Sequence, residues 1–424
     1  MARMLCTRTS DTAMIISVDW IPGIYVAFGL AVLGLRKVPV GAMRDWLFAG
    51  INLGAIFTVH FAARDPRAIL VFWAYLVAVI GMYPAMRILA ARSASFWLAF
   101  ALPILLMTGV RYMPMAWLAQ GLHGLQEVLR RNPDFSLAPY FLGVSYLAFR
   151  CSRMLVDVRN GAPWPTFVQF LGFAFFFPVM SVGPIHRWEQ HREALQNKTT
   201  FPVSQCLQRI VIGLAKAVFL AGWVGQLAYS QMFFDGHLHV PSDLAISAIA
   251  YYLYLYLNFS GYCDVAIGLA GLAGIAVPEN FKNPLMARNL KEFWNRWHIT
   301  LSEWMRDLVF SPMAKNLVGR VGPKYANHAI AGIILFVFVL IGVWHGKGWT
   351  FFIYGLLHGL GVVANHYYTL ALKNHLSREQ YLSYMANRWI EAGGILMTFC
   401  YVAGTLFFMA NSPTQIYQIL HVLR

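Results

Sequence analysis

Charged residues are scarce in this sequence. Asp, Glu, Lys and Arg make up 12% of its 424 residues, whereas hydrophobic residues make up 58%. In soluble domains about a quarter of all residues are charged. The low share here excludes an ordinary soluble protein. Apolar segments of about twenty residues, the length that crosses a bilayer, recur along the whole chain. The sequence therefore predicts an all-α polytopic membrane protein.

Motifs for several kinds of chemistry are also missing. The five cysteines are scattered without a CxxC pair, and we interpret them as small core residues. No HExxH, Walker A, dinucleotide or GxSxG motif occurs. We therefore expect no metal and no permanently bound cofactor. The net charge of +15 comes mostly from Lys and Arg in loops and at helix ends, where they meet anionic lipid headgroups, so we do not expect nucleic-acid binding.

The apolar segments predict about eleven transmembrane helices. They are expected at residues 14–35, 46–62, 68–91, 95–110, 138–155, 166–183, 207–234, 243–277, 328–344, 349–372 and 389–411. The seventh and eighth runs exceed one crossing, which indicates tilted, broken or re-entrant helices. The first run contains Asp19 and is long enough to span, so we expect a retained helix rather than a cleaved signal. Successive loops are similarly basic, and the sidedness of the chain stays open.

The most unusual part of the chain runs from Glu279 to His358. Taken as one helix, residues 289–312 carry an apolar stripe and a separate polar face. The stripe consists of Phe293, Trp297, Leu301, Trp304 and Leu308, and the polar face of Asn295, His298, Ser302 and Arg306. The pattern predicts a helix at a membrane interface or in a funnel wall, with Arg306 and Asp307 in a local ion network. Spacing alone leaves His298 as either a chemical or a structural residue.

His345 is the stronger candidate for chemistry. It follows a run from Ile330 to Trp344 that holds no charged residue, and ionisable groups at membrane depth are functional candidates by default. Desolvation keeps such an imidazole neutral and able to accept a proton. Gly346 and Gly348 would leave room for a substrate. His358, one helix later, is expected to be a buried structural histidine that donates to a helix carbonyl.

A second polar segment, SVGPIHRWEQHREALQ, covers residues 181–196. Its histidines and arginines predict a solvated basic loop at the lipid headgroups. The alternative is that this segment forms part of an opening that binds an anionic or phosphorylated partner.

Five segments resemble the membrane-bound O-acyltransferase family. They are FLGVSYLAFR (141–150), SVGPIHRW (181–188), NFSGYCDVAIGLAGLAGI (258–275), PENFKNPLMARNLKEFWNRWHITLSEWMRDLVF (278–310) and VWHGKGWTFFIYGLLHG (343–359). The bacterial envelope branch is nearest, first its members in teichoic acid D-alanylation and next those in alginate and peptidoglycan O-acetylation. A departure is His186, which stands where the teichoic branch has an acidic residue.

The resemblance implies a fold and a set of site residues. Helices would surround a central funnel, with re-entrant or interfacial helices, in one integral-membrane domain over 1–424. Variable spans in 1–135 would precede a catalytic core at 138–372, and a C-terminal span at 389–411 would follow. His345 takes the place of the family's catalytic histidine and His298 that of its second motif histidine. Substrate contacts would come from Trp297, Asn295, Ser302, Arg306 and Trp344.

The resemblance also implies a reaction. A small acyl group, D-alanyl in the first place or acetyl, would move from a cytoplasmic thioester to a hydroxyl of an envelope glycopolymer or of a partner-protein relay. The donor would be the phosphopantetheine of an acyl carrier protein or acetyl-CoA. An esterase-like protein outside the cytoplasm would be a partner, and the bacterial cytoplasmic (inner) membrane the location.

Two other functions stay open. The same histidine chemistry would serve a lipid or protein acyltransferase that uses long-chain acyl-CoA. A transporter without covalent chemistry would be expected to contain an internal repeat, and no convincing repeat occurs in the sequence.

Overall fold

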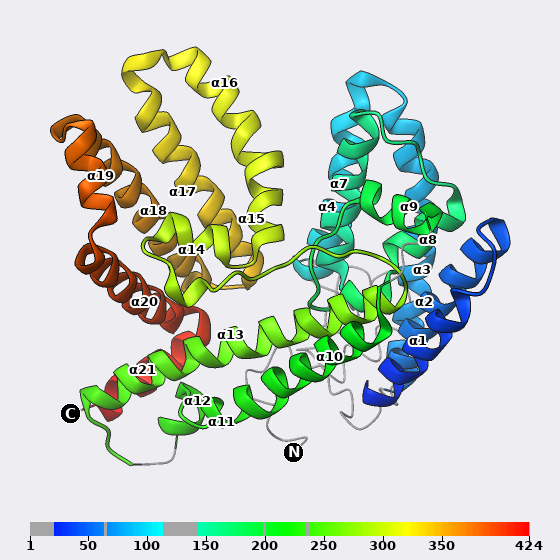
Figure 1. Ribbon diagram of the computed structural model, residues 1–424, viewed down its shortest axis with the longest axis horizontal. Helices are drawn as coiled ribbons and strands as arrows, with labels where there is room; N and C mark the ends of the chain where they lie inside the picture. Colours follow the sequence, from blue (N-terminus) through cyan, green and yellow to red (C-terminus); the bar gives the residue numbers. More distant parts are fainter. Residues whose placement is uncertain (1–20, 63–65, 113–142, 198–200, 235–236, 424) are drawn as a thin grey trace, which may run out of the picture. The chain divides into compact units, whose positions relative to one another are not determined.

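The computed structural model describes residues 21–62, 66–112, 143–197, 201–234 and 237–423 (Figure 1). Their regular structure is helical, and this part of the chain contains isolated bridge pairs but no strand. The chain divides into two compact units, Met1–Ile212 with Tyr262–Pro278 and Gly213–Gly261 with Glu279–Arg424. The domain boundaries inferred from the sequence stay a prediction.

The first unit is built around the N-terminal helices. It contains α1 (Ile21–Leu35), α2 (Ala42–Ala62), α3 (Pro66–Ala90), α4 (Phe96–Tyr112), α7 (Val144–Arg159), α8 (Phe167–Ala174), α9 (Trp188–Asn197), most of α10 (Val203–Leu214) and the end of α13 (Pro241–Leu272). Arg36 donates to the carbonyl oxygens of Gly271 at 2.7 Å and Leu272 at 2.9 Å. These bonds satisfy carbonyls that a helix end leaves without intrahelical partners, so Arg36 caps α13.

The second unit holds the Glu279–His358 stretch. Beside most of α13 it contains α11 (Ala221–Gly225), α12 (Tyr229–Met232), α14 (Leu290–Arg296), α15 (Ile299–Met305), α16 (Ser311–Val321), α17 (Ala326–His345), α18 (Trp349–His375), α19 (Arg378–Ala386), α20 (Arg388–Ala410) and α21 (Pro413–Val422). α17 and α18 form a hairpin in which Gly342 and Gly355 meet. A Cβ added to Gly342 would lie 2.9 Å from the Gly355 Cα, so only small residues permit this close approach.

The helical polytopic class is confirmed. Seven helices among the described residues are long and apolar enough to cross a membrane: Ala42–Ala62, Val71–Ala90, Ser93–Val110, Val203–Gly225, Pro241–Leu272, Pro323–His345 and Arg388–Ala410. Two shorter apolar helices, Pro22–Leu35 and Phe167–Val179, match the spans expected at 14–35 and 166–183. The expected spans at 138–155 and 349–372 do not meet the same criterion. Residues 14–20 and 138–142 lie outside the described residues.

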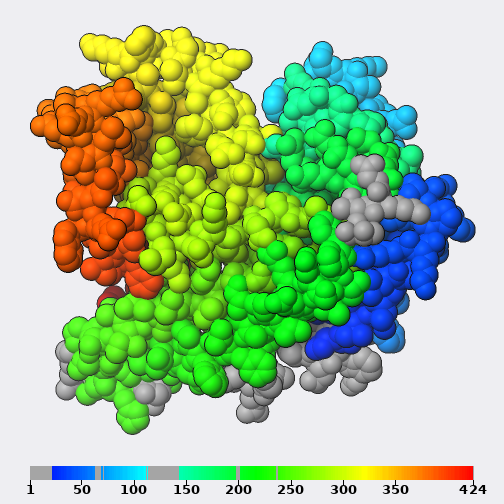
Figure 2. Space-filling view, in the orientation of Figure 1, coloured from blue at the N-terminus to red at the C-terminus, as the bar shows by residue number. Residues whose placement is uncertain are grey.

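Apolar side chains face outwards along these helices. In Figure 2 the orange surface belongs to α19 and the adjoining ends of α18 and α20. Leu382 and Met385 are exposed there, and Trp389 is 86% exposed. Arg378 and Arg388 lie beside them and are also exposed. Exposed aromatic and basic side chains together are typical of the interface between membrane and water.

Candidate active site

The chain breaks between α14 and α15. α14 ends at Arg296, Trp297 is extended, and His298 precedes α15 with φ 44° and ψ 50°. This left-handed conformation is uncommon for a residue with a Cβ. The single helix predicted over 289–312 is therefore wrong.

Backbone pairing with a distant segment holds this break open. The Lys282 N–H donates to the Arg296 carbonyl at 2.9 Å, and the Ile299 N–H donates to the Asn280 carbonyl at 3.0 Å. Phe281 and Trp297 form the bridge pair between these bonds. The Arg296 carbonyl and the Ile299 amide therefore form hydrogen bonds with residues 280–282. In one continuous helix both groups would instead bond to other residues of that helix.

The side chain of Asn280 anchors the same turn. Asn280 is 1% exposed, and its Oδ1 accepts from the Thr300 N–H at 3.2 Å and the Thr300 hydroxyl at 2.9 Å. The His298 Nδ1 lies 3.3 Å from the same oxygen. Because this oxygen only accepts, we assign the His298 proton to Nδ1, which makes Nε2 the basic nitrogen. Burial, and next the neighbouring His345, lower the pKa of His298 to about 3, so the ring is neutral near pH 7.

His345 lies in the last turn of α17 and is half-buried. Its ring lies 4.6 Å from the ring of Trp344 between centroids. Trp344 also contacts His298 edge-on, with centroids 6.4 Å apart. Two histidines from separate segments of the chain therefore lie against the same tryptophan.

His358 extends this cluster into the core. Tyr354 contacts His345 edge-on at 5.7 Å and His358 at 4.7 Å between ring centroids. The Thr405 hydroxyl donates to the Val402 carbonyl at 3.0 Å, so it accepts from the His358 Nε2, 2.9 Å away. The burial expected for His358 is confirmed, since the residue is 1% exposed. The expected carbonyl partner is wrong, because the partner is a hydroxyl on α20.

The two glycines after His345 differ in their surroundings. A Cβ added to Gly346 would overlap the ring of Phe351, whereas Gly348 has open space and a φ of 115°. The room for substrate expected at Gly346 is therefore filled by Phe351, and that expectation is wrong.

The residues predicted to contact substrate are scattered. Trp297 is buried and Asn295 is exposed. The Ser302 hydroxyl donates to the Trp297 carbonyl at 3.4 Å. Arg306 is 55% exposed and pairs with Asp307 at 3.1 Å. The common polar face does not form, because the break at His298 interrupts the helical period. The substrate roles of these residues stay predictions.

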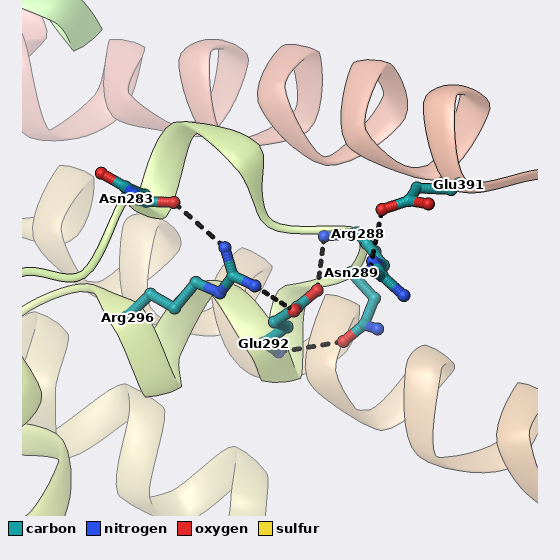
Figure 3. A network of polar contacts seen from close by, with 6 residues as sticks. All are labelled: Asn283, Arg288, Asn289, Glu292, Arg296 and Glu391. Carbon is teal, nitrogen blue, oxygen red and sulfur yellow. Dashed lines mark hydrogen bonds and ion pairs between the residues drawn. The ribbon is translucent and has the colours of Figure 1, made fainter. Parts of the chain in front are cut away.

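A network of charged groups fixes the start of α14 (Figure 3). Glu292 accepts from the Arg288 N–H at 2.7 Å and pairs with Arg296 at 2.5 Å. Arg288 pairs with Glu391 on α20 at 2.8 Å. Asn289 caps the helix by accepting from the Glu292 N–H at 2.9 Å. This network was not predicted from the sequence, although Asn followed by Glu three residues later is a helix-start signal.

The site residues Asn280, Tyr354 and Thr405 were also not predicted from the sequence. Asn280 belongs to the PENF motif, which was the available signal. Tyr354 and Thr405 lie in apolar helices, and no spacing pattern marks them. Among the described residues, no three His, Cys, Asp or Glu side chains gather to hold a metal ion.

The segment at 181–196 buries its histidines. His186 and His191 are both 0% exposed, and the His186 Nε2 lies 3.0 Å from the His191 Nδ1. Phe173 packs edge-on against both rings, and Arg187 pairs with Asp157 at 2.7 Å. The solvated loop predicted here is wrong for the histidines, because the surrounding aromatic side chains draw them into the core.

This buried pair predicts a stability that falls in acid. Burial lowers the pKa of His186 well below 6.5 and that of His191 to about 3. Below about pH 6.5 the unfolded chain binds protons that the folded chain excludes, so the free energy of unfolding decreases by up to about 1.4 kcal/mol per pH unit for each histidine. Thermal unfolding between pH 7.5 and 4.5 measures this slope.

A double variant, His186→Gln with His191→Gln, cannot titrate at these positions and should give a flatter slope. His375→Gln, which removes an exposed histidine on α18, is the control with the wild-type slope. Equal slopes in wild type and the double variant would contradict the prediction.

Comparisons with known proteins agree with the sequence resemblance. Residues 149–406 match the model of MBOAT, the membrane-bound O-acyltransferase family. A teichoic acid D-alanyltransferase of Streptococcus thermophilus is 31% identical over 273 residues, which cover 61% of this chain and 65% of that protein. A probable alginate O-acetylase of Pseudomonas syringae is 34% identical over 56% of this chain and 46% of that protein. A peptidoglycan O-acetyltransferase of Helicobacter pylori is 32% identical over 52% and 41%.

The matched region covers less than two thirds of each of these three relatives. The family match, in contrast, covers more than half of this chain and includes both His298 and His345. Together with its apolar helices, it makes the protein a multi-pass membrane protein. The chain belongs to the membrane-bound O-acyltransferase family.

Proposed function

We propose that the protein transfers a small acyl group from a thioester to a hydroxyl. The observation that carries this proposal is the contact of His298 and His345 with the same tryptophan, Trp344. Family membership supports the reaction class. The names of the relatives, a D-alanyltransferase and two O-acetylating proteins, support a small acyl group.

The chemistry needs few protein groups because a thioester is already activated. His345 takes the proton from the acceptor hydroxyl as a general base. The hydroxyl oxygen then bonds to the acyl carbon, the carbon–sulfur bond breaks, and the proton passes to the departing sulfur to give a thiol. His298, whose orientation Asn280 sets, accepts a hydrogen bond at Nε2 from a second polar group of the acceptor and so positions the reacting hydroxyl beside His345.

We favour D-alanyl as the acyl group and the phosphopantetheine of a carrier protein as its donor. The acceptor is a hydroxyl of an envelope glycopolymer or of a partner protein outside the cytoplasm, and the chain lies in the bacterial cytoplasmic membrane. The similarity to a D-alanyltransferase supports this choice.

Acetyl transfer is the second candidate. His186 stands where the teichoic branch has an acidic residue, and here it is buried against His191. The alginate and peptidoglycan relatives, at 34% and 32% identity, are as similar as the D-alanyltransferase over the matched residues, although they match a smaller share of the chain. Acetyl-CoA would then be the donor.

Thiol release from two donors separates these candidates. The protein, reconstituted in vesicles with a polyol acceptor, receives D-alanyl carrier protein or acetyl-CoA at equal concentration. We expect release from the D-alanyl donor to be at least about tenfold faster, a difference of about 1.4 kcal/mol in transition-state binding. Faster release from acetyl-CoA would assign acetylation instead. Folded protein that releases thiol from neither donor would contradict both candidates.

A further inference from the structure

A cavity of about 410 Å³ lies in the first unit, outside the histidine site. Its walls come from the end of α3, the start of α4 and the end of α7, which adjoin in this unit (Figure 1). The residues that matter for a ligand are Arg87, Ser93, Phe96, Arg159 and Trp164. The proposed acyl transfer uses none of them.

The cavity carries positive charge without a balancing acid. Arg87 and Arg159 line it, and no Asp or Glu is among its lining residues. The Arg159 guanidinium lies 4.5 Å from the centroid of the Phe96 ring, a contact that orients the cation. Within the described ranges neither arginine forms an ion pair. Two arginines in such a setting favour a ligand with a phosphate or carboxylate group.

A buried donor in the same wall also lacks a partner. The Trp164 Nε1 is buried, and it has no hydrogen-bond partner among the residues that the structure describes. Leaving such an N–H without an acceptor costs free energy. A small shift of the indole that brings this N–H to the cavity wall would let a ligand oxygen accept from it, so the donor and the two cations point to the same chemical class.

The position of the cavity identifies the source of that anion. Residues 71–90 and 93–110 are both candidate membrane spans, and the cavity lies where the first ends and the second begins. This junction therefore falls at a boundary between membrane and water. Ile88, Trp97 and Leu98 are 56% to 70% exposed on the adjoining turns, an apolar surface that lipid chains would cover.

We infer that this cavity binds the phosphate headgroup of an anionic membrane lipid. Arg87 and Arg159 pair with the phosphate oxygens, the Trp164 N–H donates to one of them, and the acyl chains lie along α3 and α4. Basic pockets between transmembrane helices bind anionic headgroups in this way. The inference does not depend on the acyl transfer proposed above.

Native mass spectrometry of the full chain in neutral detergent tests the inference. We expect phosphatidylglycerol to bind at least about tenfold more tightly than phosphatidylcholine. Arg87→Gln combined with Arg159→Gln should weaken phosphatidylglycerol binding at least about tenfold, the usual effect of losing charge-assisted hydrogen bonds. Trp164→Phe keeps both charges and should weaken binding several-fold, an effect that general attraction between charges would not produce.

Arg92→Gln is the matched control, because Arg92 is exposed on the same connection and does not line the cavity. It should change binding less than about twofold, as expected for a surface charge. Equal losses in Arg92→Gln and the double variant would overturn the inference. Displacement of the lipid by millimolar inorganic phosphate would overturn the choice of lipid and assign a free anion. Thermal unfolding of each variant without lipid shows that it is folded.

Discussion

Replacing His345 with alanine is expected to lower kcat/KM for acyl transfer by about 10²- to 10⁴-fold, the range that a positioned general base contributes. The half-buried ring lies between Trp344 and Tyr354 in contact distance of both, so a water molecule in its place would lack its position and basicity. The rate of thiol release from the donor in reconstituted vesicles measures the loss.

Two controls make this result specific to His345. His375→Ala removes an exposed histidine from α18 and should keep wild-type activity. An unchanged unfolding midpoint of His345→Ala would show that the core is intact, as expected for a half-buried residue at the end of α17. A folded His345→Ala protein with more than about a tenth of wild-type kcat/KM would rule out a general-base role.

Replacing His298 with alanine is expected to lower kcat by about 10²-fold, because misplacing a reacting group by about 1 Å costs that much. Asn280→Ala should come close to the same loss, since the Asn280 Oδ1 orients the His298 ring and also holds Thr300. Steady-state kinetics of the two single variants and the double variant measure both effects. The double variant should lose little more than His298→Ala alone, because both changes act through one group.

Thr300→Val is the matched control for this pair of variants. It removes the hydroxyl bond to Asn280 and leaves the contact between Asn280 and His298 in place, so activity should change less than about threefold while stability falls by about 1 kcal/mol. The pH profile gives an independent readout. Since burial lowers the pKa of His298 to about 3, its replacement should leave the acid limb of the profile unmoved. Additive losses in the double variant, or a shifted acid limb, would contradict this role.

The helical class and much of the packing could be predicted from the sequence. Apolar runs near twenty residues identified most of the long helices, since a helix satisfies its backbone hydrogen bonds within itself, as the membrane interior requires. Of the predicted apolar stripe, Phe293, Trp297, Leu301 and Trp304 are buried. Phe293 lies on α14 and Leu301 and Trp304 lie on α15, whereas Trp297 lies in the extended break between the two helices.

The break itself could not be predicted, because its cause lies far along the chain. Periodicity describes a helix from its own residues, whereas the Asn280–Lys282 segment bonds to the backbone on both sides of His298. The burial of His186 and His191 was not predicted for a similar reason. Composition marked their segment as polar, but Phe48 and Phe173, which pack against His191, come from two other helices, α2 and α8.

The proposed activity is tested most directly by counting products in reconstituted vesicles. With radiolabelled acyl donor and a polyol acceptor, wild-type protein should form one ester for each thiol that it releases, and His345→Gln should form neither above background. Ester formation by folded His345→Gln at the wild-type rate would contradict the role of His345. Movement of unmodified solute without any release of thiol would contradict acyl transfer itself.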